Sequence, residues 1–138
     1  ATYGLFKANE QSLNFQPLMY MSNITRRLMQ NIDYKRVAKE RRENYLFFQK
    51  RLKNANRLKL ELGKGSVPLV YPYLVNKPNM RERLIRNKIF IAQYWPNVLE
   101  RCEKSSVEYW LANNLLALPV DQRIEEADLI EICKLLGE

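Results

Sequence analysis

Few side chains of this sequence could carry out chemistry unaided. The chain has no histidine and only two cysteines, Cys102 and Cys133. Histidine is the commonest general base and zinc ligand, so its absence excludes a Ser-His or Cys-His nucleophile pair within the chain. The cysteines lack metal-ligand spacing and form no disulfide framework, which makes a reducing cytoplasm the expected compartment. The candidates that remain are aromatic rings, amides and arginines.

The stretch Tyr94-Trp95-Pro96 places two aromatic rings at the expected end of a strand. Two rings on a fixed backbone can cover a sugar ring or stack on a base, so Tyr94 and Trp95 are candidate substrate-lining residues. The alternative is that both rings close the local core. Arg123 is the third candidate. It follows a turn stiffened by Pro119, and it could bind a substrate phosphate, meet an acid of another domain, or only cap the last helix.

A long helix is predicted over residues 34–54, with one apolar face. Arg41 falls in the middle of that face. Burying a guanidinium unpaired is expensive, so Arg41 either reaches a carboxylate or several carbonyls, or covers the core with its stem while its head reaches water. Together with Asn44, Arg41 is interpreted as a structural anchor that ties this helix to the sheet. The apolar residues of the face are Tyr34, Val37, Ala38, Tyr45, Phe48 and Leu52.

The stretch 66–96 predicts a strand, a helix and a second strand around which the rest is organised. Residues 66–75 are β-branched and aromatic, and their two prolines lack ladder donors, so this strand should lie at an edge or carry a bulge. Asn79 can cap the helix, and Asn87 can end it in the left-handed conformation. Residues 89–91 then begin a second buried strand.

The other expected elements flank this centre. They are a helix over 22–31 capped by Ser22, an alternating strand over 57–62 joined by a Gly63–Gly65 turn into a hairpin, a helical turn after Pro96, a helix opened by the capping-box spacing of Ser105 and Glu108, a strand over 115–120, and a last helix over 125–136 that buries Leu129, Ile132, Cys133 and Leu136. Residues 1–20 show no clear period and are interpreted as an arm.

The predicted fold class is α+β. We expect a small, mainly antiparallel sheet of three to four strands, with helices packed chiefly on one face and a long N-terminal helix across it. The 138 residues, of which 46% are hydrophobic, suffice for one domain with a core. The longest uncharged apolar run, residues 67–75, is far short of the roughly 20 residues of a membrane span, so no membrane partner and no export signal are expected.

The positive charge is unevenly distributed. The net charge is +8, but residues 26–59 alone carry +9, whereas residues from 121 onward carry −4. A basic half suggests nucleic-acid binding. A solvated helix face, or a face that meets an acidic partner domain, is the favoured interpretation, and a nucleic-acid partner is not expected.

Two groups of residues resemble one known family. The first is Met21-Ser22-Asn23-Ile24, then Ile32-Asp33, then Arg41-x-x-Asn44-Tyr45; the second is the stretch from Ile91 to Pro96, then Leu118 to Arg123 with a terminal acidic helix. In this order and spacing, residues 20–138 resemble the C-terminal part of the DegT/DnrJ/EryC1/StrS aminotransferases. These are fold type I pyridoxal-phosphate enzymes that mostly act on nucleotide-linked keto-sugars. Tyr94 departs from the pattern, because many members have histidine there.

The resemblance implies that catalysis and substrate closure belong to two different domains. Residues 21–138 would be the small domain, and residues 1–20 a remnant of a large domain absent here. In the family the Schiff-base lysine, the acid at the pyridine nitrogen and the phosphate-binding residues lie in that large domain. We therefore expect no catalytic, cofactor-binding or metal residue in this chain, which alone should bind no pyridoxal phosphate and be inactive. The parent enzyme would be a homodimer that binds a sugar nucleotide.

Two other functions stay open on the residues alone. One is a basic module that binds nucleic acid or an anionic surface, supported by the +9 stretch with its interleaved aromatic residues. It lacks a nucleic-acid motif and a glycine-rich phosphate loop. The other is a free-standing interaction domain without chemistry.

Overall fold

The computed structural model describes residues 2–14, 16–75, 77 and 79–137, and it divides the chain into two compact units, residues 1–33 and 34–138. The division falls thirteen residues after the predicted domain boundary. In the first unit, α1 (Thr2–Ser12) and α2 (Asn23–Gln30) are helical. The hydroxyl of Ser22 accepts the amide of Thr25 at 3.1 Å, which confirms the predicted cap.

Within residues 1–20, which were interpreted as an arm, residues 2–12 form the helix α1. Leu5 and Phe6 of this helix are exposed, as is Leu13 just beyond it. The described side chains of α1 are exposed. An exposed helix needs no repeat of apolar residues every three to four positions, so the missing period did not exclude a helix.

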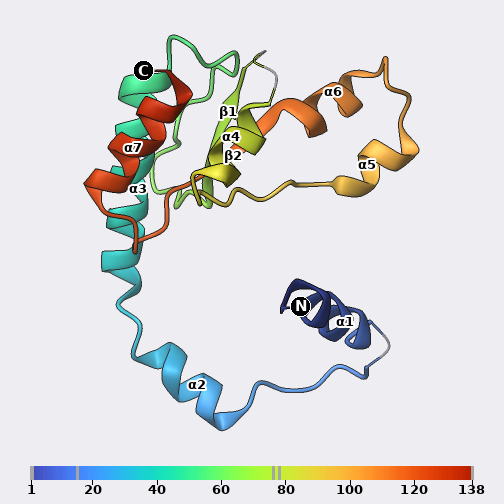
Figure 1. The fold of residues 1–138 in the computed structure, drawn as a ribbon. Helices are drawn as coiled ribbons and strands as arrows, with labels where there is room; N and C mark the ends of the chain where they lie inside the picture. Colours follow the sequence, from blue (N-terminus) through green and yellow to red (C-terminus); the bar gives the residue numbers. More distant parts are fainter. Residues whose placement is uncertain (1, 15, 76, 78, 138) are drawn as a thin grey trace. The chain divides into compact units, whose positions relative to one another are not determined.

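The second unit has the α+β composition predicted from the sequence (Figure 1). Its elements are, in chain order, α3 (Tyr34–Leu52), β1 (Val70–Leu74), α4 (Met80–Arg86), α5 (Pro96–Arg101), α6 (Val107–Asn114), β2 (Leu115–Pro119) and α7 (Glu126–Leu136). The long helix thus begins at Tyr34 as expected, but it follows two shorter helices and is not the N-terminal helix of the chain.

The core lies where α3 and α7 pack side by side against the strand pair (Figure 1). The ring of Tyr71 on β1 lies 4.9 Å from the ring of Tyr45 and 5.7 Å from that of Phe48. Burial raises the pKa of the Tyr45 and Tyr71 hydroxyls. The predicted stripe of α7 is buried, and it consists of Leu129, Ile132, Cys133 and Leu136.

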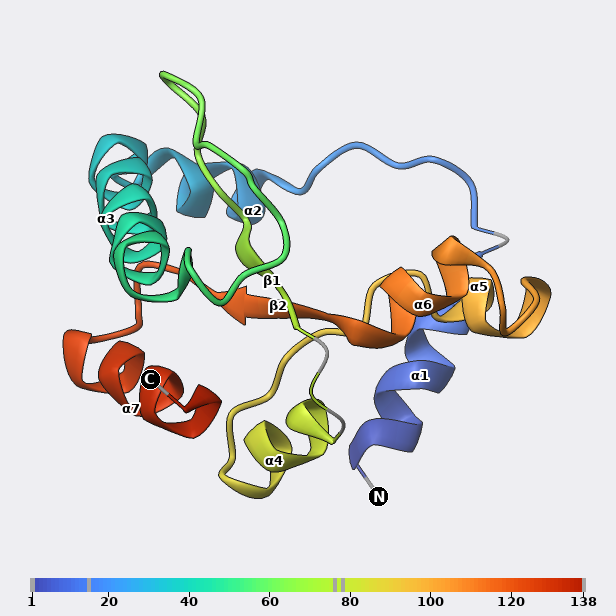
Figure 2. The ribbon, with the colours of Figure 1, turned by 90° about the horizontal axis from the view of Figure 1, so that it is seen from above.

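The sheet of the described residues has two strands, so the prediction of three to four strands is not confirmed. β1 and β2 run antiparallel, with Tyr71 opposite Leu118. Figure 2 shows that α6 continues directly into β2, and that the chain beyond β2 leads to α7. This connection places the residues after β2 beside α3.

Residues 57–62 do not form the expected strand. The turn at Gly63 is present, since the amide of Ser66 donates to its carbonyl. On the side that faces β1, the backbone amide of Arg57 donates to the carbonyl of Leu74 at 2.9 Å. The amide of Leu74, however, donates to a side chain, Asn56 Oδ1, at 3.0 Å. The Asn56 amide group thus occupies the place of a neighbouring strand.

Residues 89–91 are extended but lie outside the sheet, so the second strand of the predicted centre is also wrong. The caps of α4 differ as well. Asn79 has a φ of 59° and makes no side-chain capping bond, and Asn87 has a φ of −91°. Lys88, with a φ of 64°, is the left-handed residue after the helix. It forms a Schellman motif, because Ile89 donates to the carbonyl of Leu84 and Lys88 donates to that of Ile85.

The other predicted helix ends are close to the observed ones. Ser106, one residue after the predicted Ser105, caps α6 by accepting the amide of Tyr109 at 3.2 Å. Glu125 and Asp128 form a capping box at the start of α7, and Gly137 ends it with a φ of 92°. Within the described residues, no helix combines the length and the apolar character that crossing a bilayer requires.

Candidate functional site

Arg41 and Asn44 of α3 contact the corner that follows β2. Asn44 Nδ2 donates to the carbonyl of Asp121 at 3.0 Å and lies 3.4 Å from that of Val120. Arg41 Nε donates to Gln122 Oε1 at 3.3 Å, and its Nη1 donates to the carbonyl of Pro68 at 3.1 Å. The guanidinium of Arg41 therefore meets carbonyl and amide oxygens, one of the two arrangements considered from the sequence. Both side chains join α3 to this corner.

Arg123 lies on the outer side of the same corner. Its side chain is 82% exposed, and its Nε and Nη2 donate to the two carboxylate oxygens of Asp121 at 3.1 and 3.2 Å. This bidentate hydrogen bond holds the pKa of the Asp121 carboxyl below its ordinary value and raises the pKa of Arg123. The Asp121 side chain thus orients Arg123, while the Asp121 backbone carbonyl faces Asn44.

Tyr94 and Trp95 stand at the end of the extended segment that precedes α5. Their ring centroids lie 5.7 Å apart with planes inclined by 52°. Tyr94 is half-buried, whereas Trp95 is 62% exposed and has a φ of 53°. Pro96 then begins α5. The exposed indole does not close the local core, and its ring is available to a partner or ligand.

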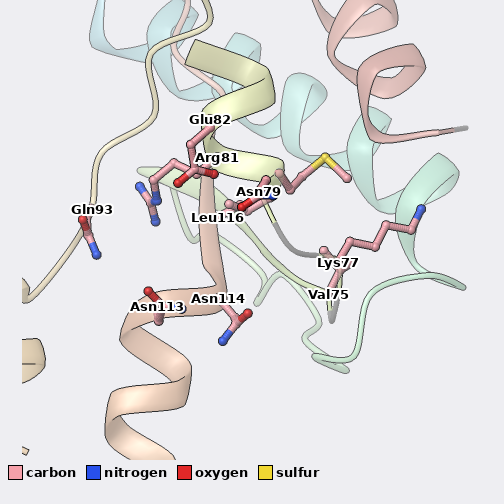
Figure 3. A pocket seen from close by; sticks show the side chains of 10 residues that line it. Val75, Lys77, Asn79, Arg81, Glu82, Gln93, Asn113, Asn114 and Leu116 are labelled. Carbon is pink, nitrogen blue, oxygen red and sulfur yellow. The ribbon is translucent and has the colours of Figure 1, made fainter. Parts of the chain in front are cut away.

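A polar hollow of about 540 Å³ lies between α4, the segment before α5, and the junction of α6 with β2 (Figure 3). Figure 3 shows Gln93 and Lys77 on opposite sides of it. The residues that line it are Val75, Lys77, Asn79, Met80, Arg81, Glu82, Gln93, Asn113, Asn114 and Leu116. Of the predicted site residues none lines the hollow, although Gln93 directly precedes Tyr94.

The charged nitrogen atoms at the hollow are held by backbone carbonyls. Lys77 Nζ donates to Leu136 O at 3.2 Å. Arg81 Nη1 donates to Ala92 O at 3.0 Å and lies 3.5 Å from Ile91 O, and its Nη2 donates to Leu115 O at 2.9 Å. Burial lowers the pKa of the Arg81 guanidinium. Neither group is arranged as a base or nucleophile.

Sequence reasoning missed this group of residues for a clear reason. Its amides and charges come from three separate stretches of the sequence, residues 75–82, residue 93 and residues 113–116, and each is an ordinary polar residue in its own stretch. Arg81 is the second residue of the short helix α4, and no pattern in the sequence distinguishes it from its neighbours. No group of three or more His, Cys, Asp or Glu side chains in the described residues could hold a metal ion.

Most of the basic residues between Lys35 and Lys59 have a partner within the chain. Ten basic residues occur between Lys35 and Lys59. Seven of them make an ion pair, a hydrogen bond to a carbonyl or a contact with an aromatic ring. Arg36 and Lys39 pair with Glu40 and Glu43; Arg41, Arg42 and Lys59 donate to carbonyls; Arg51 and Arg57 lie over the rings of Phe47 and Trp110. These contacts favour a structural role for the charge over a nucleic-acid surface.

Comparison with known family models, with curated proteins and with solved structures gave no match. The resemblance in the sequence therefore stays a prediction, and the geometry described above is what bears on function.

Proposed function

We propose that residues 21–138 are the small C-terminal domain of a pyridoxal-phosphate-dependent aminotransferase that acts on a nucleotide-linked keto-sugar. In this proposal the domain closes a substrate pocket formed with a large domain that lies outside this chain. The parent enzyme is a cytoplasmic homodimer that transfers an amino group from a donor such as glutamate to the sugar.

One observation carries this proposal: the two motifs that suggested the family touch each other. Arg41 and Asn44 belong to the first motif, and their partners Asp121 and Gln122 belong to the second, about eighty residues later in the chain. Direct hydrogen bonds between the two motifs are what a shared architecture requires of them. The contact supports an arrangement in which both motifs serve one architecture.

The exposed apolar residues of the first unit also fit the proposal. Leu18 and Tyr20 are fully exposed, and Ile24 and Leu28 of α2 are largely exposed. Single exposed apolar residues are ordinary, but several within about ten residues indicate a surface that another body covers. A large domain of the same enzyme would be such a body.

The lysine at the polar hollow is not placed to form a Schiff base with the cofactor. Lys77 is the lysine that lines the hollow, and its Nζ donates to the carbonyl of Leu136 instead of pointing to a place for an aldehyde. Pyridoxal phosphate acts as an electron sink for the carbon atom that loses a proton, and the protein around it supplies binding and orientation. In the proposal Tyr94, Trp95 and Arg123 contribute to substrate binding, and Arg41 and Asn44 hold the architecture.

The proposal is tested by comparing this chain with the protein produced from its complete reading frame. The 138-residue chain, mixed with pyridoxal phosphate and dialysed, should retain no cofactor absorbance and show no transamination. The complete protein should catalyse glutamate-dependent amination of a nucleotide-linked keto-sugar. Cofactor retained by this chain alone would overturn the proposal. Salt-dependent binding of nucleic acid near physiological salt, without any transaminase activity, would favour the basic module instead.

A further inference from the structure

The segment from residue 89 to residue 94 is held in an unusual way. It is extended, yet it lies outside the two-stranded sheet. Left-handed residues stand at both ends, Lys88 with a φ of 64° and Trp95 with a φ of 53°. Non-glycine residues in this conformation cost about 1–2 kcal/mol each and persist only where surrounding contacts impose them. Something other than a strand ladder must therefore fix the segment.

Arg81 supplies that contact. Its guanidinium lies between the middle of the segment and the start of β2, because Nη1 donates to Ala92 O at 3.0 Å and Nη2 donates to Leu115 O at 2.9 Å. Ile91 O lies 3.5 Å from the same Nη1 atom. Figure 3 shows the Arg81 side chain extending from α4 toward the segment that carries Gln93. One planar fork thus bridges two stretches of backbone that share no ladder.

The planar shape of the guanidinium explains how Arg81 can bind two backbone carbonyls at once. A guanidinium presents donors in a fixed plane and can serve two acceptors in different directions at once. A lysine ammonium is a point charge on a flexible stem and would reach one carbonyl well and the other poorly. Partial burial strengthens both bonds, since competing water is reduced around them.

We infer that Arg81 is a positioning residue for the aromatic pair Tyr94-Trp95: it holds the backbone two residues before Tyr94 and so fixes where the exposed indole of Trp95 stands. The inference about backbone position rests on the contacts alone. Its consequence for substrate binding rests on the proposed function, in which Tyr94 and Trp95 line the sugar-nucleotide pocket.

The test uses the fluorescence of Trp95 in the 138-residue chain. Trp110→Phe leaves Trp95 as the single indole and keeps an aromatic ring under Arg57. In that background Arg81→Met removes the donors, Arg81→Lys keeps the charge but loses the fork, and Arg83→Met is the matched control. Arg83 lies on the same helix with its side chain exposed. Steady-state anisotropy and acrylamide quenching report the mobility and access of the indole.

We expect Arg81→Met to lower the anisotropy of Trp95 and to raise its quenching by up to about 1.6-fold, the ratio of full exposure to the observed 62%. Arg81→Lys should fall between Arg81→Met and the parent, and Arg83→Met should match the parent. Far-ultraviolet circular dichroism shows whether each variant is folded. If Arg81→Met does not fold, Arg81→Lys decides alone, and a lysine variant with unchanged anisotropy and quenching overturns the inference.

Two further readouts separate this inference from the proposed function. Fluorescence needs neither cofactor nor substrate, so the positioning role can hold even if the complete protein has no transaminase activity. In an active complete protein, Arg81→Lys should raise KM for the sugar nucleotide several-fold with little change in kcat, because the chemistry takes place on other residues. An unchanged KM, together with altered Trp95 fluorescence, would refute the consequence for substrate binding while leaving the backbone role in place.

Discussion

Replacing Asn56 by alanine should destabilise the second unit strongly, because one buried amide serves four partners. Asn56 is only 3% exposed. Its Oδ1 accepts the amides of Leu58 and Leu74, both at 3.0 Å, and its Nδ2 donates to Pro72 O at 2.9 Å and to the Tyr71 hydroxyl at 3.3 Å. The side-chain amide of Asn56 thus donates two hydrogen bonds and accepts two.

The magnitude follows from the groups left behind by Asn56→Ala. The amide of Leu74 is buried and the carbonyl of Pro72 is half-buried, so both lose a partner that water replaces poorly. A stranded buried polar group costs about 1–3 kcal/mol, which gives a loss of about 2–6 kcal/mol for the two. For a domain of this size each kcal/mol lowers Tm by about 4–8 °C, so Tm should fall by at least about 8 °C.

Urea titration followed by near-ultraviolet circular dichroism measures this loss through the midpoint and slope of the transition. The matched control is Asn54→Ala, which removes an exposed amide two residues after the end of α3. Surface substitutions of this kind change stability by less than about 0.5 kcal/mol. If Asn56→Ala costs under about 1 kcal/mol and resembles Asn54→Ala, the amide does not hold this loop against β1 and the reasoning fails.

Three other substitutions test separate parts of the account. Lys88→Gly should raise the free energy of unfolding by about 1 kcal/mol, because glycine adopts the left-handed conformation without strain; Lys88→Ala in the same urea titration should not. Arg41→Met should lower it by about 1.5–3 kcal/mol through the lost charged hydrogen bonds to the corner, while Arg36→Met, at an exposed ion pair, should cost under about 1 kcal/mol. Asp121→Asn should be less stable than the parent at neutral pH. Because folding lowers the Asp121 pKa, this difference should shrink as pH falls below the ordinary value of 3.8, and a difference that is constant with pH would contradict the pairing with Arg123.

The elements that the sequence predicted best are those whose pattern is local. The last helix has acidic residues in its first turn, a buried stripe and a terminal glycine, and each was found where expected. The long helix from Tyr34 and the strand after residue 114 were also predicted within a few residues. In these segments the periodicity of apolar residues agrees with the tertiary burial, so one sequence suffices to find them.

The missing strands show what local pattern cannot supply. Residues 57–62 alternate as a strand should, but Leu60 is exposed, and the side chain of Asn56 takes the pairing position beside Leu74. Residues 89–91 are apolar and two of them are β-branched, yet Arg81 donates to the carbonyl of Ala92 and lies 3.5 Å from that of Ile91, in place of a ladder. In both cases a polar side chain from outside the expected strand competes with it, and no pattern within the strand reveals such a competitor.

The candidate site divides in the same way. The sequence identified Arg41 and Asn44 as an anchor because a charge in an apolar face needs partners, and the contacts to Asp121 and Gln122 supply them. The polar hollow could not be predicted, because its amides come together only after the chain folds. The roles of Tyr94, Trp95 and Arg123 in substrate binding stay predictions.

The location of the cofactor lysine tests the central claim most directly. The protein from the complete reading frame is loaded with pyridoxal phosphate, reduced with borohydride, digested and mapped by mass spectrometry. A pocket closed between two domains requires the pyridoxyl group on one lysine outside this 138-residue chain. A pyridoxyl-lysine within them, or a complete protein that forms no adduct at all, would contradict the account.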